Sequence, residues 1–152
     1  MKSRNLNAPD LTKYPPRSPR VRLGGYVILP RCLDKGRAAL AKKNGEYHFN
    51  CPVDQQFLTF AGINVGALTK QLAAGKSDGE ILEWITAHST TKPAAWEIES
   101  WSAHQSKRGP TNVKSREFFI NTLSQIGKNR EDITTWFDLL DLDDYVTFGG
   151  TA

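Results

Sequence analysis

Apolar and polar positions follow a helical spacing along most of this chain. Within residues 28–43, one side of the predicted helix carries small and apolar residues: Leu29, Leu33, Gly36 and Leu40. The opposite side carries basic residues: Arg31, Lys35 and Lys42. Recurrence every three to four residues is typical of an amphipathic helix. The segment therefore predicts a helix with a basic outer stripe.

Short start and stop signals divide the rest of the chain into further helices. A proline at the first turn, an Asn cap or a capping box before an apolar run marks a helix start. Such starts lie near Pro52, Asn64, Ser77 and Pro93, and two later helices span about 112–127 and 132–144. Residues 45–50 predict at most one short strand. The pattern predicts an all-α fold, a compact bundle of about six or seven short helices.

The first 20 residues have a different character. They contain half of the eight prolines of the chain: Pro9, Pro15, Pro16 and Pro19. Proline fixes its own φ and disfavours helix in the residue before it. Residues 1–20 are therefore predicted to form an extended Pro/Arg-rich basic arm, either disordered or lying over the surface, and residues 21–152 a single helical domain.

The composition is that of a globular protein, with 39% hydrophobic and 24% charged residues in a chain of 152. No apolar run approaches the roughly 20 residues of a membrane span, and the N-terminus lacks the apolar stretch of a signal peptide. The two cysteines, Cys32 and Cys51, leave a disulfide open, but their spacing indicates neither a disulfide framework nor a zinc site. We expect a cytoplasmic protein without membrane contact. The sequence identifies no cofactor and no oligomeric state.

Charge is distributed unevenly along the chain. Residues 1–43 contain eleven Lys and Arg against two Asp, a net charge of +9, whereas the remainder contains nine basic and fourteen acidic residues, a net charge of −5. This asymmetry indicates either a nucleic-acid or phosphate partner, or a basic end that docks on the acidic end of the same fold. Docking within the fold is favoured.

Residues 15–54 contain the best candidates for a ligand site. The adjacent Gly24 and Gly25 mark a backbone that bends or packs closely, or alternatively a backbone-amide site for an anion. They do not form a nucleotide-binding glycine loop, because the chain contains neither a G-x-G-x-x-G nor a G-x-x-x-x-G-K-[ST] pattern. Our leading hypothesis is a pocket for a small anionic molecule, formed by Arg20, Arg22, Tyr26, Arg31 and Tyr47.

A second hypothesis is an enzyme that uses the same pocket. Cys51 is predicted at the N-cap of a helix, where the helix dipole favours a thiolate, and His48 could act as a base. Asp54, in the first helical turn, opposes thiolate formation electrostatically. The alternative is a structural cysteine that behaves as a small apolar residue. As metal ligands, His48 and Cys51 are too few for a site.

Acidic residues crowd the end of the last predicted helix: Asp141, Asp143 and Asp144. Asp138, three residues before Asp141, shares a helix face with it. The helix dipole disfavours negative charge there, so a positive group should compensate. Salt bridges to the arm or to Arg31 and Lys35 are favoured. A divalent cation held by Asp138 and Asp141 is the alternative. No EF-hand loop is present.

Two further features give weaker functional indications. The four tryptophans, at positions 84, 96, 101 and 136, have the spacing of core residues, and a pocket lining is the alternative. A nucleic-acid- or protein-binding module that uses the basic arm is a third hypothesis. It is not favoured, because no recognised nucleic-acid motif is present and aromatic residues do not interleave with the arginines of the arm.

Several segments together form a recognisable set. They are DLTK at 10–13, PRSPR at 16–20, LGGYVILPR at 23–31, DKGRA at 34–38, GEYHFNCP at 45–52, DGEIL at 78–82 and WFDLLD at 136–141. Over roughly residues 9–150 they resemble a bacterial domain-of-unknown-function family, the one numbered 5069. The resemblance implies a single-domain bacterial cytosolic protein, and it brings no catalytic residue, substrate or cofactor with it.

Overall fold

Seven helices make up the part of the chain that the computed structural model describes, residues 8–152. They are α1 (Leu29–Leu40), α2 (Pro52–Ala61), α3 (Val65–Ala73), α4 (Asp78–His88), α5 (Ala95–Lys107), α6 (Val113–Ile126) and α7 (Trp136–Thr147). This range contains no strand, and its one isolated β-bridge joins Leu23 and Tyr26. The predicted all-α fold and the predicted number of helices are confirmed.

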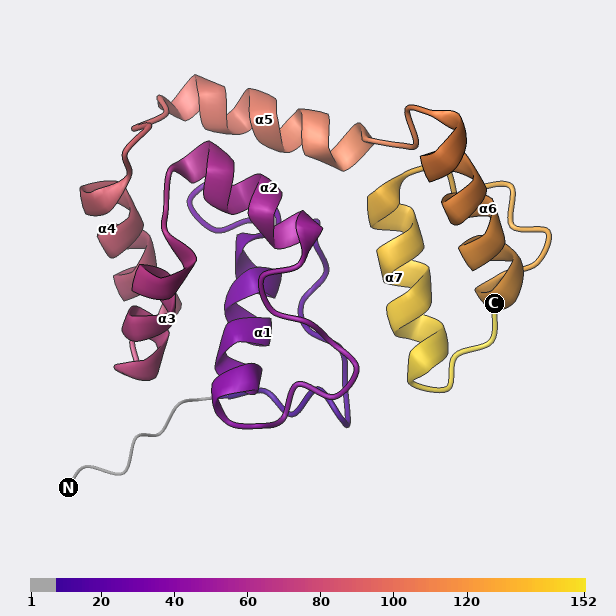
Figure 1. The fold of residues 1–152 in the computed structure, drawn as a ribbon, viewed down its shortest axis with the longest axis horizontal. Coiled ribbons are helices and arrows are strands. Elements are labelled where there is room, and N and C mark those ends of the chain that lie inside the picture. The colour runs from indigo at the N-terminus through magenta and orange to yellow at the C-terminus, as the bar shows by residue number, and fades with distance from the viewer. Residues whose placement is uncertain (1–7) are drawn as a thin grey trace.

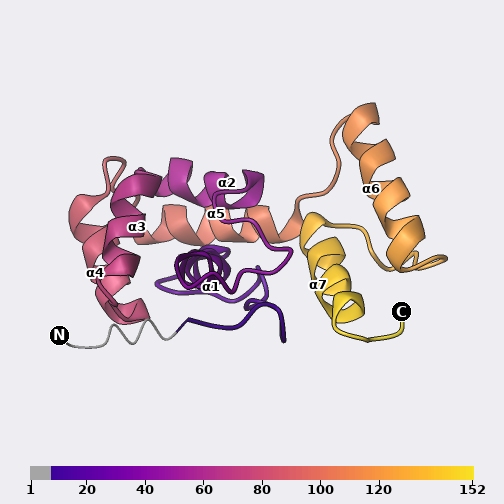
Figure 2. The same cartoon turned by 60° about the horizontal axis from the view of Figure 1, so that its bottom comes forward.

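Helix α1 lies in the middle of the fold, with α2, α3, α4, α5 and α7 around it (Figure 1). Helices α3 and α4 lie along one side, α2 and α5 cover one end, and α7 lies on the opposite side. Helix α6 packs on α7, and Figure 2 shows this pair standing apart from the rest of the body. No helix within residues 8–152 is both long and apolar enough to cross a membrane.

Capping residues set several helix starts where the sequence predicts them. The Asn64 side chain accepts a hydrogen bond from the Ala67 backbone N–H, with an O–N distance of 3.0 Å. Ser77 and Glu80 form the predicted capping box, each side chain accepting from the backbone of the other.

Helix α7 begins four residues later than the apolar spacing predicts, at Trp136. The cause is a second capping box. Thr135 Oγ1 accepts from the Asp138 backbone N–H at 3.0 Å, and the Asp138 carboxylate accepts from the Thr135 backbone N–H at 3.1 Å. Asp138 is therefore at the start of the helix, where negative charge is favoured by the helix dipole.

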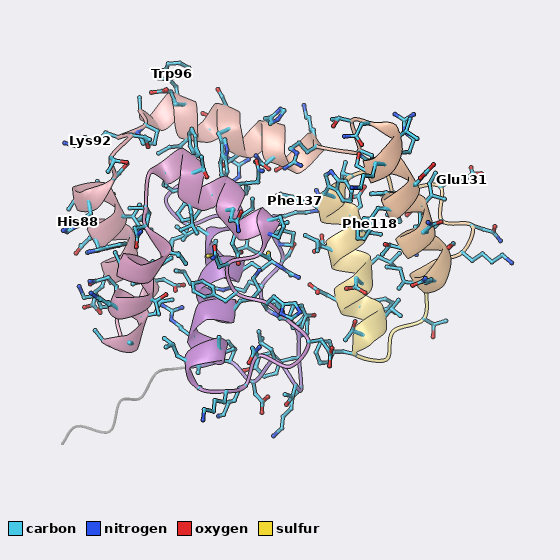
Figure 3. All side chains as sticks on the ribbon, viewed as in Figure 1. His88, Lys92, Trp96, Phe118, Glu131 and Phe137 are labelled. Atoms are coloured by element: carbon cyan, nitrogen blue, oxygen red, sulfur yellow. The ribbon has the colours of Figure 1, made fainter. Side chains whose placement is uncertain are left out.

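Two aromatic clusters form around Tyr26 and Trp136. Tyr26 is buried edge-on against Phe57, and Trp101 stacks on Phe60 with ring centroids 4.7 Å apart. Trp136 packs against the aromatic residues of α6. The expectation of a core position is wrong for Trp96, which is 70% exposed near the start of α5 (Figure 3).

The described part of the Pro-rich arm, residues 8–20, lies against the domain. Leu11 is buried and its backbone N–H donates to the Lys43 carbonyl at 2.8 Å, and Pro19 O accepts from the Ile28 N–H at 2.9 Å. Burial of Leu11 and Pro19 supplies the apolar contact that holds the segment. The first seven residues of the predicted arm lie outside the described residues.

The glycine pair forms a tight turn. Gly24 and Gly25 have φ values of +58° and +85°, which L-residues with side chains rarely adopt. A Cβ atom on Gly24 would lie 2.5 Å from Leu82 Cδ1. The backbone therefore bends here and packs against α4, as the first of the two interpretations of the glycine pair expects.

The prediction of a basic outer stripe on α1 is wrong. Arg31 and Lys35 are both only 3% exposed. Their charges are matched by carboxylates from distant elements, Asp144 in α7 and Asp54 in α2. A helix with cations on one side can be buried on both sides when each cation meets an anion.

Ion pairs join the basic beginning of the chain to acidic residues that come later. The pairs that cross this division are Arg17–Asp78, Arg20–Asp138, Arg20–Asp141, Arg31–Asp144, Lys35–Asp54 and Arg37–Asp78. These contacts pair much of the excess positive charge of residues 1–43 with the excess negative charge of the later residues. They support docking of the basic end on the acidic end, the favoured interpretation of that asymmetry.

Candidate functional site

An apolar groove of about 410 Å³ lies between the helical body and the α6–α7 pair. Its walls are Pro52, Val53, Gln56, Gln105, Arg108, Phe118, Thr122, Trp136, Phe137, Leu139, Leu140 and Asp143. Phe137 and Phe118 lie on the two sides of the beginning of α7 (Figure 3). The groove exists because α7 contacts α5 and α6 while α6 is held away from the body.

Polar groups in the groove gather at the end of α5. Gln105 is buried, its Nε2 lies 3.4 Å from Gln56 Oε1, and its own Oε1 lies 3.3 Å from Arg108 Nη1. Arg108 is half-buried and forms no ion pair with a carboxylate within residues 8–152. The groove thus combines an apolar lining with one guanidinium, two side-chain amides, the Thr122 hydroxyl and the Asp143 carboxyl group.

A second cavity of about 210 Å³ adjoins the groove. Its lining consists of Arg31, Lys35, Glu46, Tyr47, His48, Cys51, Val53, Leu140, Asp143 and Thr147. Val53, Leu140 and Asp143 line both spaces. The two cavities are therefore neighbours across these three side chains, the first lined mostly by apolar residues and the second mostly by residues with polar side chains.

One wall of the polar cavity is a buried network centred on Asp144. Arg31 donates two hydrogen bonds to its carboxylate, at 2.7 and 3.1 Å, and the Tyr47 hydroxyl donates a third at 2.7 Å. Burial and this hydrogen bond raise the pKa of Tyr47, so the hydroxyl keeps its proton at neutral pH. The guanidinium of Arg31 also lies 5.5 Å from the centre of the Tyr47 ring.

Asp143 has a less favourable environment than its neighbour Asp144. Burial, and then the negative charge of Asp144, raise the pKa of Asp143, while Arg31 partly opposes them. Asp143 lines both cavities. It therefore places a carboxyl group with a reduced tendency to ionise at their junction.

Cys51 and Lys35 also line the polar cavity, and the buried Asp54 contacts Lys35 from behind. Lys35 Nζ lies 2.9 Å from Asp54 Oδ2 and 3.1 Å from Cys51 Sγ. Asp54 is fully buried, and its second oxygen, Oδ1, has no hydrogen-bond partner within residues 8–152. As predicted, Cys51 is the N-cap residue of α2.

The structure separates the residues that the sequence assigns to one anion site. Arg31, Tyr47, His48 and Cys51 do line one cavity, with His48 exposed at its rim. The remaining three candidates lie elsewhere: Arg20 pairs with Asp138 and Asp141, Arg22 is exposed, and Tyr26 is in the core. Arg20 and Arg31 are already neutralised by carboxylates, so they contribute little net positive charge for an anion.

The candidate metal ligands Asp138 and Asp141 also have protein partners. Both accept hydrogen bonds from Arg20, and Asp141 accepts another from Ser18 at 2.7 Å. Among the described residues, no group of three His, Cys, Asp or Glu side chains is placed to hold a metal ion. The arm supplies the positive charge that the favoured salt bridges require.

The polar residues of the groove are absent from the candidates that the sequence indicates. Arg108 falls in a short polar run that is typical of solvated surface, and Gln56 and Gln105 are amide side chains of a kind that is ordinary on helix surfaces. The helical spacing places Lys35 on an outer stripe. No local sequence pattern marks these positions, because the residues around them in the structure come from other helices.

The described helices and the two adjoining cavities define a small all-α protein with a candidate ligand site beside α7. The sequence matches the family model named Domain of unknown function (DUF5069) over residues 13–146, and the chain belongs to this family. This confirms the family that the sequence motifs indicate. No curated protein matches the chain.

Proposed function

We propose that this protein binds a small apolar molecule with an anionic end in the groove between α2, α5 and α7. The single observation that carries this proposal is an apolar groove of about 410 Å³ with an arginine in its wall. This volume falls within the roughly 300–1,000 Å³ of small-molecule sites, which combine an apolar lining with a few polar groups.

Arg108 is the residue that selects for an anionic end. Of the other arginines within residues 8–152, five have a carboxylate partner, while Arg22 and Arg116 have none and are exposed. Arg108 is half-buried beside apolar side chains, where a charge–charge hydrogen bond is stronger than in water. The proposal thus keeps an anionic ligand but moves it from the N-terminal arginines to the end of α5.

A fluorescent apolar anion tests this site directly. We expect 8-anilinonaphthalene-1-sulfonate to bind the full chain with increased fluorescence and dodecanoate to displace it. Dodecanol, which has the same apolar chain but no charge, should displace it more weakly. The Arg108→Gln variant should lose about tenfold to a hundredfold in dodecanoate affinity, the effect of one charge-assisted hydrogen bond.

Two further variants test whether these probes bind in the groove or elsewhere on the protein. Arg22→Gln removes an exposed arginine of the predicted N-terminal anion site, and it should leave dodecanoate binding unchanged. Thr122→Trp places a large side chain in the groove wall and should abolish binding of all three probes. Equal effects of Arg108→Gln and Arg22→Gln, or unchanged binding in Thr122→Trp, would show that the groove is not the site.

A further inference from the structure

The contact between Lys35 and Cys51 joins a buried amine to an accessible thiol. The Nζ and Sγ atoms are 3.1 Å apart, and Lys35 is 3% exposed. Lysine is rarely buried to this extent, and here Asp54 Oδ2 at 2.9 Å balances its charge. Burial between α1 and α2 restricts the amine, which keeps Nζ at the sulfur.

Small reagents can reach this sulfur from the polar cavity. Cys51 is half-buried and lines the cavity of about 210 Å³, whereas Cys32 is fully buried and lines neither cavity. The thiolate is the nucleophilic form of cysteine. Cys51 Sγ lies at the N-terminus of α2 in contact with Lys35 Nζ, and the Asp54 carboxylate contacts the same amine.

The Asp54 carboxylate lies directly beside the Lys35 amine. Its Oδ2 accepts hydrogen bonds from the backbone N–H groups of Asn50 and Cys51 and from Lys35. Its Oδ1 is buried without a hydrogen-bond partner within residues 8–152. A buried unpaired oxygen is a costly arrangement for a carboxylate. Transfer of the Lys35 proton to Asp54 would yield two neutral groups, including the free amine.

We propose that Cys51 is a site of oxidation by hydroperoxides, and that Lys35 captures the oxidised sulfur as a covalent link between α1 and α2. In the first step Sγ attacks a peroxide oxygen and the O–O bond breaks. The sulfur is oxidised by two electrons to a sulfenic acid, the peroxide is reduced, and an alcohol or water leaves. In the second step the neutral Lys35 amine attacks Sγ. An S–N bond forms, the S–OH bond breaks, and water leaves.

Cys32 is the competing partner for the sulfenic acid. Burial above all, and then the charge of Asp54, raise the pKa of Cys32 well above its usual value. Cys32 therefore remains a thiol and attacks slowly, because disulfide formation uses the thiolate. The Lys35 amine is in direct contact with the Cys51 sulfur, so we expect it to react first.

Peptide mapping of the full chain after brief treatment with hydrogen peroxide tests the proposal. The link removes two hydrogens, so the intact mass should fall by about 2 Da, and dithiothreitol should restore it. Trypsin should no longer cleave after Lys35, and peptide 32–37 should be joined to peptide 44–70. A Cys32–Cys51 disulfide has the same mass but leaves Lys35 cleavable. Thiol counting in denaturant separates the two, since the S–N link leaves one alkylatable thiol and the disulfide leaves none.

Variants supply matched controls for this chemistry. Cys32→Ala should retain the link, whereas Cys51→Ala should lose it. Lys35→Arg preserves the charge beside Asp54 and should stop the reaction at the sulfenic acid, with a gain of about 16 Da. If Lys35→Arg does not fold, the peptide map of the unmodified sequence still decides. The proposal is overturned if the wild-type chain gains oxygen without losing Lys35 cleavage, or if Cys32→Ala abolishes the link. These outcomes do not depend on whether the apolar groove binds a ligand.

Discussion

Arg31 in α1 and Asp144 in α7 are 113 residues apart, yet they form two hydrogen bonds of 2.7 and 3.1 Å in the interior of the protein. Their side chains are only 4% and 8% exposed. The pair, together with Tyr47, fixes α7 beside α1 and so forms part of the cavity wall. The position of the candidate site therefore depends on this contact.

Removing one charge of this pair should be strongly destabilising. Asp144→Asn leaves the Arg31 guanidinium buried without its counter-charge, and we expect the free energy of unfolding to fall by about 3–5 kcal/mol. Urea denaturation followed by circular dichroism measures this loss. The exposed pair Arg130–Asp132 is the control, and Asp132→Asn should change stability little. A loss at Asp144 no larger than at Asp132 would contradict a central role of the pair.

Stability should decline at acidic pH through Asp78 and Asp138. Burial would raise the pKa of Asp78, but hydrogen bonds from Arg17 and Arg37 outweigh it and lower the value. The pKa of Asp138 is lowered as well. Burial would raise it, but backbone hydrogen bonds from Thr134 and Thr135 and a side-chain hydrogen bond with Thr135 outweigh burial. A lowered folded-state pKa gives stability that is present above the unfolded-state value, near pH 4, and lost below it.

Unfolding in urea at several pH values between 7 and 3 checks this expectation. Asp78→Asn should be less stable than the wild type at pH 7 and should lose less stability on acidification. The difference in the free energy of unfolding between Asp78→Asn and the wild type should therefore become smaller as the pH falls. A constant difference across this range would show that Asp78 does not carry the pH dependence.

Asp143 should affect the pH dependence of stability in the opposite direction. Its pKa is raised, first by burial and second by Asp144, so the ionised form costs stability in the folded protein at neutral pH. Asp143→Asn should therefore be modestly more stable than the wild type at pH 7, and the gain should vanish near pH 3, where both states bind the proton. Thermal unfolding at pH 7 and near pH 3 measures this gain in stability. An equal gain at both pH values would point to a cause other than charge.

The turn at Gly24 should not tolerate a side chain. Gly24→Ala combines a φ of +58° with a Cβ placed 2.5 Å from Leu82 Cδ1, and we expect a loss of more than about 1 kcal/mol. Gly79→Ala is the matched control, because its Cβ meets nothing within 4 Å and alanine favours helix. It should stabilise the protein by up to about 1 kcal/mol. Denaturant unfolding compares the two, and equal effects would argue against strain at Gly24.

The helices of this protein follow from local signals in its sequence. Asn64 and the capping box of Ser77 and Glu80 act over three residues, so their meaning survives without knowledge of the fold. The predicted start of α7 is wrong although its signal is equally local, since Thr135 and Asp138 form the same kind of box. The apolar spacing alone does not locate that start.

The sequence by itself determined the helical class, most helix starts, the family, and the expectation that positive groups would meet the acidic residues of α7. Only the tertiary structure decided which charges pair, because Arg31 and Asp144 are close in space and distant along the chain. It also decided that Lys35 is buried beside Cys51 and that Arg108 lines a groove. Helix formation depends on neighbours within one or two turns, whereas cavities and buried ion pairs depend on how whole helices pack.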